Sequence, residues 1–190
     1  MAETSHTAGD AVNHAFITGA NGAGMTDLGT LGGSLSVAYG INASGQVAGY
    51  ATTAGNATTH AFITGANGVG MTDLGSLGGA SSNAYGINAS GQLAGTALTA
   101  GDAANHAFIT SANGVGMIDL NSLITFADGD YLLEARGIND NGQIIANSAF
   151  GRAFLLSEVA ALPEADTSAM LLAGLGLLGL VTRRKHKTTV

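Results

Sequence analysis

The sequence contains no cysteine, a single proline, and few charged or aromatic residues. Without cysteine the chain can form neither a disulfide framework nor a thiolate metal site. Charged residues make up 10% of the chain and aromatic residues 5%. A hydrophobic core therefore has to come from Ile, Leu, Val, Phe and Tyr side chains spaced thinly along short strands.

Basic residues are almost missing outside the last eight positions. Residues 1–166 contain all thirteen acidic residues, two arginines and no lysine, which gives this part a net charge of −11. Nucleic-acid binding needs basic groups that displace counterions from the phosphates. The composition therefore excludes nucleic acid as a partner, and an acidic surface without lysine suits a secreted protein.

The N-terminus lacks the features of a secretory signal. Residues 1–13 contain neither a basic start nor an apolar segment, and a secretory signal requires both. These residues are small and polar, so we expect them to form a flexible lead-in to the rest of the chain.

The chain does contain an internal repeat of 46 residues. Residues 14–33, HAFITGANGAGMTDLGTLGG, return at residues 60–79 with two changes in twenty positions. A more divergent copy begins at His106, and RAFLLS begins on the same schedule at Arg152. Such a period has to be recognised first, because a missed repeat leads to a wrong fold.

A second motif lies between the copies of the first. It begins as YGINASGQ at Tyr39 and Tyr85, and as RGINDNGQ at Arg136. The last spacing is 51 residues instead of 46, which indicates a five-residue loop insertion at residues 126–130.

Each repeat predicts four short strands joined by turns. In the first strand, Ala15 and Ile17 alternate with His14 and Phe16, which is the period of a strand. Glycine-rich segments mark the turns, and Gly45 suits a tight hairpin because glycine accepts a positive φ. In the first repeat the remaining strands are expected at residues 24–28, 38–42 and 46–50, followed by a linker at 51–59.

Four strands within 40–50 residues are typical of a propeller blade. We predict an all-β fold of four-stranded antiparallel meanders over residues 14–157, with about fourteen strands or three and a half blades. Propellers close with four to eight blades, so this number gives an open arc with unpaired edges. Three arrangements stay open: a homodimer that completes the ring through its open sheet edges, an open solenoid, or a fragment of a longer array.

The composition changes after residue 157. Residues 158–166 contain Pro163 and Glu164 and are predicted to be a linker. Residues 167–182 are uncharged and would span about 24 Å as a helix at about 1.5 Å per residue, so a transmembrane helix is predicted, with a buried core helix as the alternative. The basic tail 183–190 is expected to stay cytoplasmic.

The C-terminal residues resemble a PEP-CTERM sorting signal. Pro163 and Glu164 precede the apolar stretch, Arg183, Arg184 and Lys185 follow it, and Ala165 replaces the second proline of the family's triplet. The resemblance implies an exosortase as partner, cleavage near the triplet, a transient stay in the inner membrane, and delivery to the surface or matrix of a Gram-negative bacterium.

The repeats resemble the HAF family of probable extracellular repeats. His-Ala-Phe begins at residues 14, 60 and 106, Asp-Leu-Gly at residues 27 and 73, and Gly-Ile-Asn at residues 40, 86 and 137. The resemblance covers residues 14–157 and implies no established activity. It also implies an N-terminal signal, so an incomplete gene model or a decayed copy would account for the sequence of residues 1–13.

Three residue types recur once per repeat and are expected to be structural. Three histidines could ring a metal ion if the repeats form blades, although a hydrogen bond between neighbouring blades is the simpler hypothesis. The aspartates are expected to accept turn N–H groups, and the asparagines begin hairpin turns, of which only 139–142 is similar to part of a calcium loop. These residues are His14, His60, His106, Asp27, Asp73, Asp119, Asn42, Asn88 and Asn139.

We therefore expect a non-enzymatic, structural or adhesive surface protein without catalytic residues, metal site or cofactor. Its partner beyond the exosortase and the membrane would be an extracellular polysaccharide, held on shallow surfaces of Asn, Thr, Tyr and Gln. The alternative is a lyase or hydrolase that acts on polysaccharide, which a cluster of acids and aromatics at one end of the array would favour. A fold alone cannot decide between them.

Overall fold

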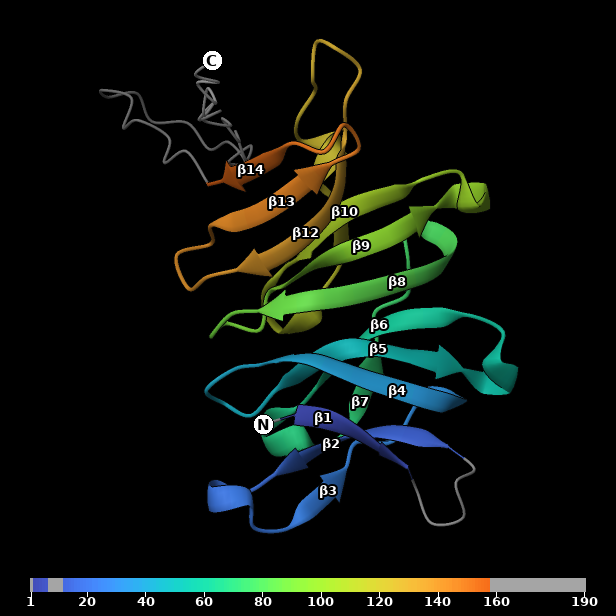
Figure 1. Cartoon of the computed structure of the whole chain (residues 1–190), viewed down its shortest axis with the longest axis vertical. Helices are drawn as coiled ribbons and strands as arrows, with labels where there is room; N and C mark the ends of the chain where they lie inside the picture. The colour runs from blue at the N-terminus through green and yellow to red at the C-terminus, as the bar shows by residue number, and fades with distance from the viewer. Residues whose placement is uncertain (1, 7–11, 158–190) are drawn as a thin grey trace, which may run out of the picture.

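A computed structural model describes residues 2–6 and 12–157 of the chain. This part contains fourteen β-strands and six short 3-10 helices, and it has no α-helix. The strands form small sheets that are stacked into a column along the longest axis of the molecule (Figure 1). The prediction of an all-β fold is therefore confirmed.

The strands of the two central sheets have the same lengths, and those of the last sheet are shorter. Their bounds are β1 (Ala2–His6), β2 (Asn13–Thr18), β3 (Met25–Asp27), β4 (Gly32–Ile41), β5 (Val47–Thr53), β6 (Thr59–Thr64), β7 (Met71–Asp73), β8 (Gly78–Ile87), β9 (Leu93–Thr99), β10 (Asn105–Thr110), β11 (Met117–Asp119), β12 (Leu132–Ile138), β13 (Ile144–Ser148) and β14 (Ala153–Leu156). The 3-10 helices are η1 (Ala20–Gly22), η2 (Ala54–Asn56), η3 (Ala66–Gly68), η4 (Ala100–Asp102), η5 (Ala112–Gly114) and η6 (Leu120–Ser122).

The two central sheets are four-stranded antiparallel meanders. One contains β4, β5, β6 and β7, and the other contains β8, β9, β10 and β11. The first sheet has β1, β2 and β3, and the last has β12, β13 and β14. Single parallel contacts, Asn13 with Leu35 and Thr59 with Ser81, join the first three sheets into one continuous sheet of eleven strands.

The sheets do not coincide with the repeat counted from its histidine. The histidine strand β6 is the third strand of its sheet, because the short segment between Thr53 and Thr59 folds β6 back antiparallel on β5. The chain leaves that sheet only after β7. A period that begins at His60 therefore starts in one sheet and ends in the next.

The column is open. Strands β1–β3 lie at one end of the long axis and β12–β14 at the other (Figure 1), so the described residues form no closed ring. Of the three arrangements left open by the sequence, an open stack is the one observed in the single chain. A homodimer through the open sheet edges stays a prediction.

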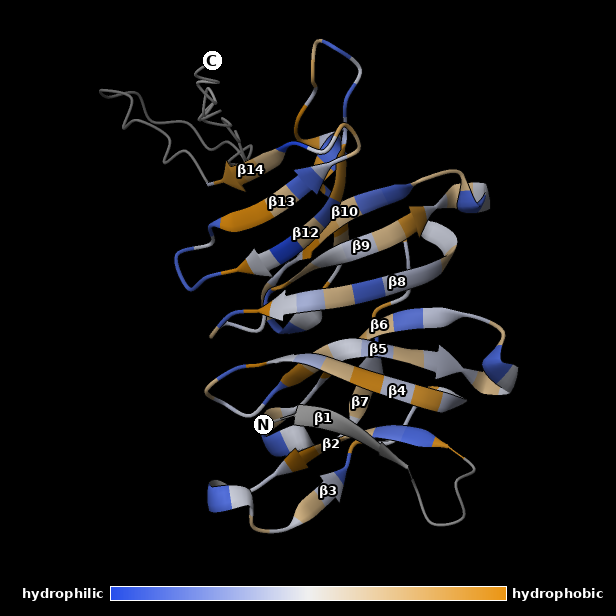
Figure 2. Ribbon diagram, in the orientation of Figure 1, coloured by the Kyte–Doolittle hydropathy of each residue, from blue (hydrophilic) through white to orange (hydrophobic). Residues whose placement is uncertain are grey.

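Hydrophobic clusters lie between neighbouring sheets. Successive residues of β6 belong to different clusters: Phe62 packs with Leu28, whereas Ile63 packs with Leu93 and Phe108. Hydrophobic residues therefore occur in short segments that are distributed over many strands (Figure 2). A fully buried Phe or Leu side chain stabilises the fold by about 1.5–3 kcal/mol. The third cluster contains Ala94, Ala107, Leu120, Leu132, Ala135, Ile144, Ala146, Phe154 and Leu156.

Several predicted boundaries differ from the structure. Strand β5 continues to Thr53, three residues into the predicted linker 51–59. Strand β4 begins at Gly32, six residues before the predicted start, because its first half crosses toward the preceding sheet and meets β2 at Leu35. The lead-in at residues 1–13 is not wholly irregular, since Ala2–His6 pair with β2 in antiparallel register.

The predicted linker 158–166, transmembrane helix 167–182 and basic tail 183–190 lie outside the described residues. Within residues 2–6 and 12–157, no helix has the length and apolar character needed to cross a membrane.

Candidate functional site

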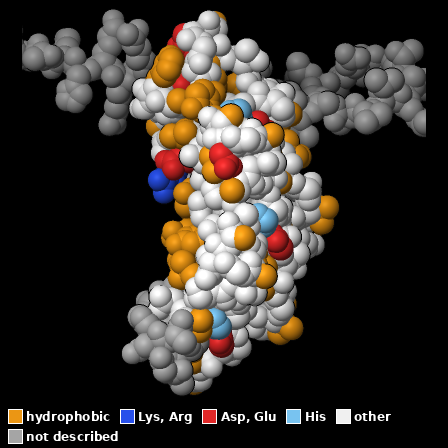
Figure 3. All heavy atoms as spheres, turned by 90° about the vertical axis from the view of Figure 1, so that its right-hand side faces the viewer, with side chains coloured by type: hydrophobic (Ala, Val, Ile, Leu, Met, Phe, Trp, Pro, Cys, Tyr) orange, Lys and Arg blue, Asp and Glu red, His pale blue; other side chains and the backbone are white. Residues whose placement is uncertain are grey.

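The recurring histidine and aspartate of each repeat form a pair. Figure 3 shows the pairs as pale blue and red side chains at three heights along one side of the column. Both partners lie in one hairpin, since β2 pairs with β3, β6 with β7 and β10 with β11. The distances from Nδ1 to the carboxylate are 2.8 Å for His14–Asp27, 2.9 Å for His60–Asp73 and 2.7 Å for His106–Asp119.

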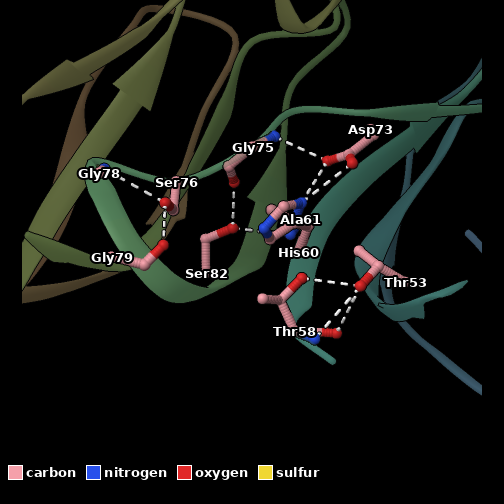
Figure 4. A network of polar contacts seen from close by, with 10 residues as sticks. All are labelled: Thr53, Thr58, His60, Ala61, Asp73, Gly75, Ser76, Gly78, Gly79 and Ser82. Carbon is pink, nitrogen blue, oxygen red and sulfur yellow. Dashed lines mark hydrogen bonds and ion pairs between the residues drawn. The ribbon is translucent and has the colours of Figure 1, made fainter. Parts of the chain in front are cut away.

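Each aspartate also fixes the turn that follows its strand. The Asp73 carboxylate accepts the Gly75 N–H at 2.7 Å in addition to Nδ1 of His60 (Figure 4). Burial opposes ionisation of Asp27, but hydrogen bonds from His14 and the Gly29 N–H outweigh it and lower the pKa of Asp27. A carboxylate only accepts hydrogen bonds, so Nδ1 of the histidine is the donor.

The histidines do not converge on a metal ion. Among the residues that the structure describes, no three His, Asp or Glu side chains come together as metal ligands, because the pairs lie on separate sheets one repeat apart. The expected hydrogen bond between neighbouring blades is also absent from these pairs, which join two strands of the same hairpin.

The recurring asparagines connect neighbouring sheets. In the turn that follows β8, Oδ1 of Asn88 accepts the N–H groups of Ser90 at 3.1 Å and Gln92 at 3.0 Å. Its Nδ2 donates to Oε1 of Gln92. It also donates to the carbonyl oxygen of Asn139, a residue of the next sheet, with a distance of 3.2 Å between the two atoms. Asn42 makes the equivalent bond to the Asn88 carbonyl at 3.1 Å. The three asparagines therefore form a ladder along the column.

The turn at residues 139–142 is a hairpin turn. Oδ1 of Asn139 accepts the N–H groups of Asn141 and Gln143, and Gly142 has a φ of 72°. The Asp140 carboxylate accepts the Ala89 N–H of the neighbouring sheet at 2.8 Å. This acid therefore supports the contact between two sheets, as the asparagine ladder does.

Two buried serines connect successive sheets and were missed by sequence reasoning. The Ser82 hydroxyl accepts the Ala61 N–H at 2.8 Å and donates to the Gly75 carbonyl at 2.5 Å (Figure 4). Ser36 makes the same two bonds one repeat earlier. The only signal in the sequence is a serine that recurs after 46 residues, among many other serines.

The C-terminal sheet contains an ion-pair cluster that sequence reasoning also missed. Nε of Arg152 donates to Oδ2 of Asp130 at 2.7 Å, and its Nη1 lies 2.8 Å from Asp128. The Asp130 side chain is fully buried and accepts the N–H groups of Tyr131 and Phe150. Arg152 stands where the earlier repeats have a histidine. Both acids belong to the insertion at 126–130, so the insertion supplies the ion-pair partners of Arg152.

The carboxyl group of Asp130 is held in its charged form. Burial raises the pKa of this group, but hydrogen bonds from Ser148, Arg152 and two backbone N–H groups outweigh the burial and lower the pKa to about 2. The pKa of Asp128 is also lowered, chiefly by its hydrogen bond with Arg152. Neither carboxyl group is therefore suited to donate a proton near neutral pH.

A row of aromatic and charged side chains runs across three sheets, on their first strands and, for Tyr50, on β5. The Tyr39 ring lies 5.5 Å from Tyr85 and 5.7 Å from Tyr50, measured between ring centroids. The Arg136 guanidinium lies 4.7 Å from the centre of the Tyr85 ring, and its Nη2 lies 2.8 Å from Glu134. We call Tyr39, Tyr50, Tyr85, Glu134 and Arg136 the tyrosine stripe.

Comparison with known proteins identifies the C-terminal segment. Residues 161–185 match the PEP-CTERM protein-sorting motif. No curated protein and no solved structure matches the chain. The predicted sorting signal is confirmed, and the motif indicates an exported protein that an exosortase sorts, with transit at the membrane before export to the surface of a Gram-negative bacterium. Pro163, Glu164, Arg183, Arg184 and Lys185 lie within the match.

Proposed function

We propose that the chain is a non-enzymatic, structural or adhesive protein of the cell surface or extracellular matrix, built from HAF-type repeats. The sorting motif at residues 161–185 is the observation that carries the proposal. Such a motif directs a protein out of the cell, where an elongated column of stacked sheets offers a long lateral surface. An extracellular polysaccharide is the partner that best fits this location.

The use of the recurring polar residues supports a structural role for the repeats. The histidines, aspartates and asparagines of the motifs bond to one another, to turn N–H groups or to the next sheet. No buried side-chain nitrogen or oxygen within the described residues lacks a hydrogen-bond partner. Polar groups whose hydrogen bonds are made within the scaffold stabilise it, which supports a structural role for these residues.

The alternative of a polysaccharide-degrading enzyme has one observation in its favour, the acids and aromatics at the C-terminal end of the array. Asp128 and Asp130 lie there beside Phe126 and Phe154, whose ring centroids are 5.0 Å apart. Glycoside hydrolysis needs one carboxyl group with a raised pKa as the proton donor. Both pKa values are lowered here, so we favour a structural ion pair over a catalytic one.

Cell fractionation tests the sorting step. The full chain, joined to a cleavable secretory signal, is produced in an exosortase-containing bacterium and in a strain without the exosortase. We expect a cleaved product in the surface fraction of the first strain and uncleaved protein in the membrane fraction of the second. The double change Pro163→Ala with Glu164→Ala should abolish cleavage, and Glu158→Gln, outside the matched residues, should not.

Two results of this experiment would contradict the proposal. An uncleaved product in both strains would exclude sorting by the exosortase. A cleaved wild-type protein that stays in the periplasmic fraction would exclude a surface or matrix role.

A further inference from the structure

Three residues of the tyrosine stripe occupy the same place in three sheets. Tyr39, Tyr85 and Arg136 lie at equivalent positions of β4, β8 and β12, and in each strand the antiparallel register shifts at this residue. A bulge leaves one residue unpaired and redirects its side chain. Each of the three sheets therefore turns one side chain toward the same face of the column.

This face is accessible and continuous. Tyr39 is 51% exposed, and the Arg136 side chain is 52% exposed. Strands β4, β8 and β12 lie in front in Figure 1, and Figure 3 shows hydrophobic side chains with a basic and an acidic group along the corresponding left edge. A tyrosine ring offers a large apolar face, and its hydroxyl group offers a hydrogen bond.

The repeats differ from one another around the stripe. The segments 14–33 and 60–79 are nearly identical, but Tyr50 corresponds to Thr96 and Asn147 in the later repeats. The residues that pair with these positions across the sheet vary as well. Val37 pairs with Tyr50, and Glu134 pairs with Asn147. The variation lies within the stripe, at Tyr50, Glu134 and their counterparts, whereas the His–Asp pair recurs in three successive hairpins.

The stripe has no net charge. The Arg136 guanidinium is balanced by Glu134, whose burial opposes ionisation but whose hydrogen bonds with Asn147 and Arg136 lower its pKa. Burial, reinforced by Tyr39, raises the pKa of Tyr50, and burial raises that of Tyr85. The phenol groups of Tyr50 and Tyr85 are therefore held in their neutral form. With a net charge of −11 over residues 1–166, the surrounding surface repels polyanions.

We propose that the tyrosine stripe binds a strand of uncharged polysaccharide that lies along the column. The tyrosine rings would pack against the apolar faces of successive sugar rings, and Glu134, Arg136 and Asn147 would bond their hydroxyl groups. Glu134 and Asn147 offer acceptors and Arg136 and Asn147 offer donors at one end of the aromatic row. Such polar groups fix the orientation of a ligand and provide specificity. This inference rests on the proposed function, because only an exported protein meets such a polymer.

Affinity electrophoresis of the full chain in mild detergent tests the inference. Native gels contain dextran, galactomannan or mixed-linkage β-glucan as neutral probes, or alginate as an anionic probe. We expect retardation by at least one neutral polymer and none by alginate. Tyr39→Ala and Arg136→Gln should each weaken retardation about tenfold, while Tyr39→Phe, which keeps the ring, should retain most of it.

Phe150→Ala is the matched control, because Phe150 is an aromatic residue that is 63% exposed outside the stripe. Its retardation should equal that of the wild type, and circular dichroism should show the same β-structure in all variants.

Unchanged binding of Tyr39→Ala and Arg136→Gln would overturn the stripe as the site but leave the proposed function intact. Stronger binding to alginate would overturn the assignment of an uncharged ligand. No retardation by any neutral polymer would overturn the inference, while the fractionation experiment would still decide surface sorting.

Discussion

At the scale of single residues, the recurring acids of the hairpins serve the turns that follow them. Asp73 has two partners, Nδ1 of His60 and the Gly75 N–H, and both bonds lie within one hairpin. This arrangement explains why histidine and aspartate recur together, thirteen residues apart. The histidine donates to the aspartate, and the same aspartate accepts the turn N–H, so a structural role accounts for both residues.

Two substitutions of Asp73 should distinguish the contribution of its hydrogen bond to the turn from that of its pair with His60. We expect Asp73→Ala to lower the free energy of unfolding by about 1 kcal/mol, because the Gly75 N–H and His60 both lose their acceptor. Asp73→Asn should cost less, since its amide oxygen can still accept the turn N–H. Urea unfolding of both variants measures the difference. An equal cost for the two would show that the charge, and not the turn acceptor, is what stabilises the hairpin.

Asp130 should make stability depend on acid pH. Its pKa is about 2 in the folded chain against 3.8 as the ordinary value. A lowered pKa adds stability that is fully present above the ordinary value and is lost as the pH falls toward 2. The melting temperature of the wild type should therefore fall between about pH 5 and pH 2, as thermal unfolding followed by circular dichroism would show.

Two variants separate this effect from general acid denaturation. Asp130→Asn should melt earlier than the wild type at pH 7 and lose less between pH 5 and pH 2, because it has no carboxyl group to titrate. Arg152→Gln should move the loss to higher pH, since it removes a charged donor from Asp130. Parallel pH profiles for the wild type and Asp130→Asn would exclude Asp130 as a source of the acid sensitivity.

At the scale of elements, the asparagine turn that follows the first strand of a sheet makes different contacts in different sheets. Asn88 is 4% exposed and bonds both its own turn and the Asn139 carbonyl of the next sheet. Asn139 makes the equivalent turn bonds at an exposed position, and its Nδ2 donates to Gln143 at 2.8 Å. The chain thus provides its own control for a bond between sheets.

The asparagine ladder predicts unequal effects of one substitution. Asn88→Ala should destabilise the chain by about 2–3 kcal/mol, because two N–H groups of its turn and a contact between sheets lose their partner. Asn139→Ala should cost about 1 kcal/mol less, since no bond to a further sheet is lost. Urea unfolding of the two variants measures the difference, and a larger loss for Asn139→Ala would contradict the ladder.

Element identity was predictable, but sheet membership was not. The alternation of Ala61, Phe62 and Ile63 predicts a strand, and the structure sends alternate side chains to two cores. The sequence could not show that β6 belongs with β4 and β5, because a repeat has no intrinsic beginning. That choice depends on the short connection to β5 and on the separate crossing from β7 to β8.

At the scale of the whole molecule, the column is a one-dimensional stack in which each sheet contacts its neighbours. The hydrophobic clusters lie between adjacent sheets. In such arrays, stability is close to a sum of repeat and interface contributions. The position of a core substitution along the column should therefore decide how far its effect spreads.

Hydrogen exchange should reveal this dependence. Leu28→Ala weakens the first interface, and we expect lost protection mainly in β2 and β3. Leu93→Ala, at a fully buried position of the central interface, should cost about 3 kcal/mol and reduce protection in the sheets on both sides. Exchange measured by mass spectrometry resolves the strands. Uniform loss in both variants would show one cooperative unit in place of a stack.

The sequence by itself determined the all-β class, the period of 46 residues, the recurring hairpin residues and the sorting motif. These depend on local alternation, on turn residues and on a short linear signal. Only the tertiary structure decided that the array is open, that Arg152 meets Asp128 and Asp130, and that the tyrosine stripe crosses three sheets. The physical reason is that these contacts join distant residues, with 22 positions between Asp130 and Arg152 and 51 between Tyr85 and Arg136, and only the tertiary fold brings such residues together.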